Sequence, residues 1–173
     1  MRQLLFIIIL ILAASLSYGN KTILYLNKCY NLSDTSIKES IFPTKNKDKI
    51  EKIVADIGRY ETVDAAIVGF SGTKSAQYKR FEKLLWGATD SQLMKLTDNF
   101  NSNVKAYSFW ALAIKKYPAI KTILEKHLND RQTFQYLNGC VGSTKKINEW
   151  FLELAKDILT GEEIKKYSSM ILK

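Results

Sequence analysis

The sequence has few of the residues on which enzyme chemistry most often depends. It contains one histidine, His127, and two cysteines, Cys29 and Cys140, in 173 residues. No second histidine or nearby cysteine stands at a metal-ligand spacing from His127, and no G-x-S-x-G motif is present. We therefore predict no metal site, no cofactor and no catalytic residues. His127 lies near the end of an expected helix, where a cation suits the helix dipole, so we interpret it as structural.

Long apolar runs are also scarce, and the one at the N-terminus has the features of a targeting segment. Residues 4–14 are continuously apolar after a single positive charge at Arg2. A run of about eleven residues is too short to cross a bilayer. Small residues follow it, so we predict a secretory signal peptide at residues 1–19, cleaved after Gly19; the alternative is an uncleaved membrane anchor. The expected location is periplasmic or extracellular, with no transmembrane segment after processing.

Acidic residues are outnumbered, with 17 against 26 Lys and Arg, which gives a formal net charge of +9. The excess is spread along the chain, because lysines alternate with acidic residues over 45–52 and 74–83. Dispersed charge of this kind is typical of a solvated surface rather than of a nucleic-acid stripe. We predict no nucleic-acid partner, while weak attraction to an anionic surface stays open.

The two cysteines form an even count, which an oxidising compartment would allow to pair. A Cys29–Cys140 disulfide would close a loop of more than a hundred residues. In the chain-entropy model that closure is worth about 4–5 kcal/mol. The alternative is two buried free thiols that pack as small apolar groups.

Helical periodicity dominates the chain beyond an extended segment at residues 20–44. We expect a single helical domain over 45–173, with its centre at 104–117, where a helix has no wide polar face. Residues 62–70 fit either a helix, which we favour, or a buried strand. Residues 131–143 read as irregular or as a distorted helix, with Ser143 capping the next helix. The predicted class is all-α, an irregular solenoid-like stack of antiparallel helix pairs.

The stretch 89–116 reads as two helices joined by a polar turn, opened by Thr89 and Gln92 at capping-box spacing. It resembles a HEAT-type (armadillo-like) helical repeat, in which an Asp stands near the turn and a Val-Arg pair starts the second helix. Here Asp98 and Val104-Lys105 take these places. A looser second unit covers 118–136. The residues expected to form the core of the repeat are Leu93, Leu96, Val104, Tyr107, Ser108, Ala111 and Leu112.

The resemblance implies a protein-binding body and supplies no catalytic residues. Two other patterns bear on catalysis or ligand binding. Residues 69–75 approach a phosphate-binding loop, but the adjacent Gly-Lys pair is missing. Glu149, Glu153 and Asp157 share a polar helix face that is typical of solvent exposure. We therefore expect an exported, non-enzymatic module that binds another protein; the alternative is a cationic protein held to anionic polymers or lipids of the cell envelope.

Overall fold

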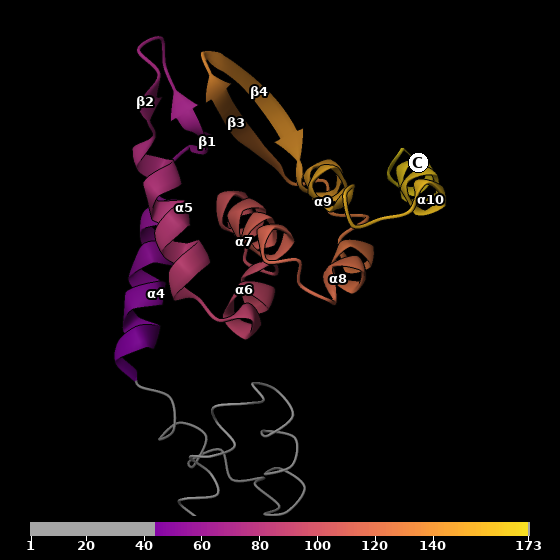
Figure 1. The fold of residues 1–173 in the computed structure, drawn as a ribbon, viewed down its shortest axis with the longest axis horizontal. Coiled ribbons are helices and arrows are strands. Elements are labelled where there is room, and N and C mark those ends of the chain that lie inside the picture. Colours follow the sequence, from indigo (N-terminus) through magenta and orange to yellow (C-terminus); the bar gives the residue numbers. More distant parts are fainter. Residues whose placement is uncertain (1–43, 173) are drawn as a thin grey trace, which may run out of the picture. The chain divides into compact units, whose positions relative to one another are not determined.

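The computed structural model describes residues 44–172 of the chain, and the surroundings of side chains from residue 48 onward. Within this range seven helices accompany one four-stranded sheet (Figure 1). The helices are α4 (Thr44–Gly58), α5 (Ala76–Gly87), α6 (Asp90–Leu96), α7 (Ser102–Ile114), α8 (Ile120–Lys126), α9 (Ile147–Ala155) and α10 (Gly161–Ile171). The strands are β1 (Thr62–Val68), β2 (Thr73–Lys74), β3 (Thr133–Gly139) and β4 (Val141–Lys146).

The sheet has the strand order β2-β1-β3-β4. Its two central strands, β1 and β3, run parallel, and Val63 faces Tyr136 in their register. β2 and β4 are antiparallel neighbours at the two edges. Helices α5 to α8 lie in the chain between β1 and β3, which is the long connection that parallel neighbours need. The prediction of an all-α solenoid is therefore wrong, because a mixed sheet interrupts the succession of helices.

The segment that we favoured as a helix, 62–70, is strand β1 followed by a turn. Four of its first seven residues are β-branched, and the strand pairs on both sides, with β2 and β3. The apparent helical face was misleading, since Val63 is fully buried while Phe70 is fully exposed. The β-branched residues favour a strand locally, and pairing with β3, some seventy residues away, fixes that conformation.

The segment expected to be irregular, 131–143, forms most of the β3–β4 hairpin. Asn138 pairs with Val141, so Gly139 and Cys140 make a two-residue turn. Gly139 has a φ of 58°, the positive value that a type II′ hairpin turn needs at its first position. Ser143 lies within β4 and caps no helix; α9 begins at Ile147 instead. The looser repeat unit over 118–136 is likewise wrong, because it runs from α8 into β3.

Helix α7 forms the centre of the core, as its sequence predicts. It packs against α5, α6, α9, β1 and β3. On one side the ring of Tyr107 stacks on Phe81 at a centroid distance of 4.8 Å, and on another Phe109 stacks on Phe151 at 3.9 Å. A helix surrounded on most sides can be apolar nearly all round, which explains the missing polar face.

Two helices begin at capping boxes that can be recognised from the spacing of residues in the sequence. The side chains of Thr89 and Gln92 complete a capping box at the start of α6, and Thr160 and Glu163 do the same for α10. Each box satisfies backbone N–H groups that the first helical turn leaves without partners. Among residues 44–172, no helix is both long and apolar enough to cross a membrane.

Candidate functional site

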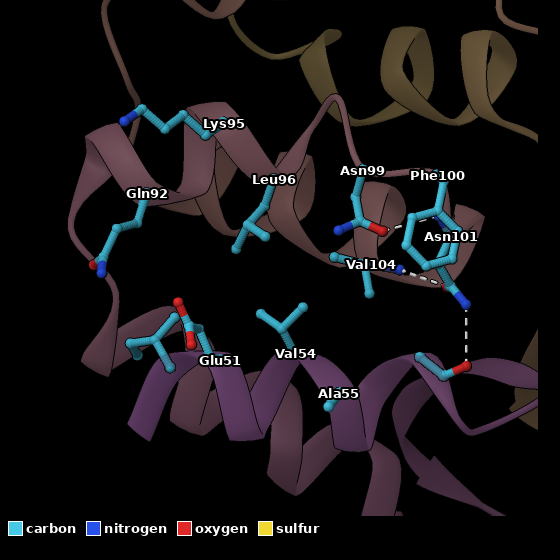
Figure 2. A pocket seen from close by; sticks show the side chains of 12 residues that line it. Glu51, Val54, Ala55, Gln92, Lys95, Leu96, Asn99, Phe100, Asn101 and Val104 are labelled. Carbon is cyan, nitrogen blue, oxygen red and sulfur yellow. Dashed lines mark hydrogen bonds between the residues drawn. The ribbon is translucent and has the colours of Figure 1, made fainter. Parts of the chain in front are cut away.

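A groove of about 720 Å³ runs between α4 on one side and α6 with the α6–α7 turn on the other (Figure 2). Its volume is in the range of ligand-binding clefts. Apolar side chains contribute much of the lining, from α4, α6 and the start of α7. The groove-lining residues are Ile50, Glu51, Val54, Ala55, Gly58, Gln92, Lys95, Leu96, Asn99, Phe100, Asn101 and Val104.

The α4 wall follows from the spacing of its apolar residues. Ile50, Ile53 and Ile57 fall on the buried side of the helix, and Val54, one position round, is only partly buried. Val54 faces Leu96 of α6 across the open space in Figure 2. Leu96 is also only partly buried. Because these two apolar side chains face each other without packing together, they form an apolar floor on which a ligand could lie.

Asn101 closes one end of the groove by joining α4 to α7. Its Oδ1 accepts hydrogen bonds from the backbone N–H groups of Asn103 and Val104, at 3.0 and 3.2 Å, and so caps α7. Its Nδ2 donates to the carbonyl oxygen of Gly58 at 3.0 Å, near the end of α4. The side chain of Asn103 adds a second link, to the carbonyl of Tyr60 at 2.6 Å.

The α6–α7 turn places an aromatic ring at the edge of the groove. Phe100 is 88% exposed although it lines the groove. The turn is held by the hydrogen bond from the N–H of Asn101 to Oδ1 of Asn99, at 2.9 Å. A large apolar side chain that is exposed to solvent beside an apolar groove is typical of a binding surface.

A charged group lies on each side of the groove. Glu51 belongs to α4 and Lys95 to α6. Neither has an ion-pair partner among the residues that the structure describes. Within the described part of the chain, both are thus available to charges on a ligand.

A polar cluster around the buried ring of His127 links the α6–α7 turn, through Asp98, to α7 and α8. Nδ1 of His127 lies 3.3 Å from Oδ2 of Asp130, and Nε2 lies 3.2 Å from Oδ1 of Asp98, where the alignment is too poor for a hydrogen bond. Lys105 of α7 donates to the same oxygen of Asp130. His127 is buried, whereas the side chain of Asp98 is 46% exposed, and the cluster links the α6–α7 turn to α7 and to the end of α8.

The two carboxyl groups of this cluster have lowered pKa values. At Asp98 the hydrogen bond from Lys126 lowers the pKa most, and partial burial opposes it without reversing the direction. At Asp130 burial is the largest influence and raises the pKa, but hydrogen bonds from Lys105 and from the N–H of Gln132 outweigh it. Both groups are thus held as carboxylates in the folded protein.

A second buried cluster joins β1 to α5 and α7. The carboxylate of Asp64 accepts hydrogen bonds from the hydroxyls of Thr62 and Ser75, each at 2.6 Å. The hydroxyl of Tyr107 accepts from the N–H of Asp64 and donates to its carbonyl. Burial raises the pKa of Tyr107 far above its usual value. Ser75 also caps α5, so the stretch 69–75 is a turn, strand β2 and a helix cap rather than a phosphate cradle.

The other residues that the sequence suggested for catalysis or for a disulfide lie in exposed positions or outside the described residues. Glu149 and Glu153 pair with Lys146 and Lys145, each at 2.9 Å, on an exposed face. Cys140 is exposed in the β3–β4 turn. Cys29 and the predicted signal peptide lie outside the described residues, so the disulfide and the export signal stay predictions. Among the described residues, no three His, Cys, Asp or Glu side chains gather as metal ligands would.

The expected core of the repeat is brought together around α6 and α7, although no solenoid forms. Six of its seven residues are buried, and the seventh, Leu96, lines the groove. Comparison with known proteins adds no identification: no family model matches the chain, and no curated protein matches it significantly. The groove is therefore the feature of this chain that points to a function.

Proposed function

We propose that this is an exported, non-enzymatic protein that binds an amphipathic helix of another protein in the groove between α4 and α6. The observation that carries the proposal is the unclosed apolar floor between Val54 and Leu96, with Phe100 exposed beside it. Insertion of an apolar helix face into such a groove is a common mode of peptide recognition.

The length of the groove fits a short helical segment. On α4 the lining extends from Ile50 to Gly58, a rise of about 12 Å at 1.5 Å per residue. That is about two helical turns. Apolar side chains at positions i, i+3 or i+4, and i+7 of a partner helix cover the same length and form one stripe.

The flanking charges indicate what borders that stripe. A basic residue on one edge of the partner helix would meet Glu51, and an acidic residue on the other edge would meet Lys95. Such exposed pairs contribute mainly to orientation and specificity rather than to raw affinity. The occupant is therefore an amphipathic helix with opposite charges on the two sides of its apolar face.

A second candidate function is supported by the net charge of +9: electrostatic attachment to an anionic polymer or lipid surface. The two differ in their dependence on salt. Surface attachment by dispersed lysines weakens steeply with ionic strength, whereas burial of apolar side chains does not.

The proposal is tested by selecting helical peptides from a displayed library with the purified chain, at low and at high salt. Ala55 is exposed and lines the groove, so Ala55→Arg would place a long side chain in the floor without disturbing the core. Ala76→Arg is the matched control, because it makes the same substitution at an exposed position of α5, outside the groove.

We expect selected peptides to share an apolar i, i+3 or i+4, i+7 stripe and to keep their affinity at high salt. Ala55→Arg should weaken them at least tenfold, and Ala76→Arg should not. Peptides that bind both variants equally, or binding that disappears at high salt, would contradict the groove as the binding site and favour electrostatic attachment.

A further inference from the structure

The buried ring of His127 lies between two carboxylates that come from different parts of the fold. Nδ1 is 3.3 Å from Oδ2 of Asp130, which follows α8, and Nε2 is 3.2 Å from Oδ1 of Asp98, in the α6–α7 turn. From α9 the uncharged ring of Phe151 lies edge-on to the imidazole, at a centroid distance of 5.3 Å. The side chain of His127 is 7% exposed, so little water reaches it. Each ring nitrogen thus faces a carboxylate oxygen.

The neutral ring cannot satisfy both carboxylates. A neutral imidazole has one N–H donor and one nitrogen lone pair, whereas an imidazolium has two donors. When Nδ1 donates to Asp130, the lone pair of Nε2 faces an oxygen of Asp98, and among the described residues Nε2 has no hydrogen-bond partner. Both carboxyl groups have lowered pKa values, so both are charged at the pH where an imidazole ordinarily titrates. Protonation of the ring therefore turns a repulsive contact with Asp98 into an attractive one.

Two lysines also face this cluster, and each donates to a carboxylate. Lys126 of α8 donates to Oδ2 of Asp98 at 2.6 Å, and Lys105 of α7 donates to Oδ2 of Asp130. The pair of Lys126 and Asp98 is exposed on both sides, so water and salt screen it. It leaves the second oxygen of Asp98 beside the imidazole. The lysines thus keep the carboxylates charged without supplying the donor that Nε2 lacks when it is neutral.

Asp98 connects this contact to the groove. The next two residues, Asn99 and Phe100, line the groove (Figure 2). The side chain of Asp98 is 46% exposed, so it has room to turn toward the ring or away from it. Phe100 is 88% exposed and has little packing of its own, so its position depends on how the turn is held.

We propose that His127 is a proton switch for the α6–α7 turn. When the ring is protonated, its two N–H groups hold Asp98 and Asp130 together and fix the turn to the end of α8. When the ring is neutral, it keeps Asp130 and releases Asp98, and the turn with Phe100 moves more freely. As a control of peptide binding this inference rests on the proposed function of the groove, whereas the movement of the turn does not.

The experiment follows the ring and the turn separately in the full chain, without a histidine tag. The chain contains one histidine, so the nitrogen NMR shifts of its imidazole report the charge and tautomer of His127 without overlap. A fluorinated phenylalanine at position 100 reports the turn by fluorine NMR. Both are measured from about pH 5 to about pH 8, the range in which histidine ordinarily changes charge. No peptide is present, so the result does not depend on whether the groove binds one.

We expect the fluorine signal to move with the same pH midpoint as the ring nitrogens. Asp98→Asn should remove most of that movement, because an amide can donate to the neutral ring and accept from the protonated one. Asp90→Asn is the matched control. It removes a carboxylate of α6 that is 51% exposed and pairs with Lys115 instead of the imidazole, so it should keep the movement.

Three results would overturn the switch. They are a ring that keeps one charge state over the whole range, a fluorine signal that does not follow the ring, and an equal movement in Asp98→Asn and in the unsubstituted chain. Peptides selected on the groove should bind severalfold more weakly at the upper end of the range, because a fixed turn costs less to order on binding. Equal affinity at both ends would overturn the control of binding and would leave the groove as the binding site.

Discussion

Asn101 is expected to support the domain through two separable interactions. Its Oδ1 caps α7, and its Nδ2 reaches the carbonyl of Gly58, so Asn101→Ala removes both. Loss of an N-cap costs about 1 kcal/mol, and a hydrogen bond to an otherwise unpaired carbonyl contributes about 1 kcal/mol. We therefore expect Asn101→Ala to lower the free energy of unfolding by about 2 kcal/mol.

Asn101→Ser separates the two contributions. Serine is as good an N-cap as asparagine, but its side chain is too short to bridge α7 and α4. It should cost only the bridging bond, about 1 kcal/mol. Urea unfolding followed by circular dichroism measures both variants, and an unchanged denaturant slope would show that the difference lies in stability alone.

The reasoning would be refuted if Asn101→Ala stayed within about 0.5 kcal/mol of the unsubstituted chain, as ordinary surface changes do. Equal losses in the alanine and serine variants would show that the cap contributes nothing. Equal stability of the serine variant and the unsubstituted chain would show that the bridge to Gly58 contributes nothing, and the closed end of the groove would need another explanation.

Two further predictions concern other parts of the domain. Lys116 has a φ of 51° just after α7, while Lys116 and Tyr117 donate backbone hydrogen bonds to Ala113 and Leu112 as in a Schellman motif. Lys116→Gly should therefore raise the melting temperature, and a fall would contradict strain there. Asp98 and Asp130 have lowered pKa values when folded, so their contribution to stability is present above about pH 4 and is lost as pH falls through those values. On acidification, the urea concentration at the unfolding midpoint should fall less in the variant with both residues changed to Asn than in the unsubstituted chain. An equal fall in the two proteins would show that these carboxylates do not contribute to the acid sensitivity.

The local features of the helices could be predicted from the sequence. The capping boxes at Thr89 and Thr160 depend on residues three apart, and both are present in the structure. The burial of α7 follows from its lack of a polar face. Each of these signals is contained within one element, so no knowledge of distant partners is needed.

The sheet could not be found in this way, because its central pairing is non-local. β1 offers both strand and helix patterns, and its partner β3 follows four helices later. The one local signal for the β3–β4 hairpin is Gly139 at the first position of its two-residue turn. β4 is almost entirely exposed, so it lacks the apolar alternation by which a half-buried strand is recognised.

The groove depends on the distance between α4 and α6, which no pattern within either helix specifies. Leu96 was expected in the repeat core with Leu93, yet Leu93 is fully buried and Leu96 is left partly open. Asn101 is a good N-cap residue by type, but its bond to Gly58 joins residues 43 positions apart. Only the assembled fold shows which apolar side chains lack a neighbour.

The most direct test of the binding groove is photocross-linking from position 55 in the chain as its own cells make it. A photoreactive residue there would line the groove, and the same residue at position 76 is the control. We expect one discrete protein adduct from position 55 only, with the cross-linked peptide of the partner forming an amphipathic helix. The absence of a protein adduct at position 55, or the same adducts from both positions, would contradict a groove that binds a partner helix.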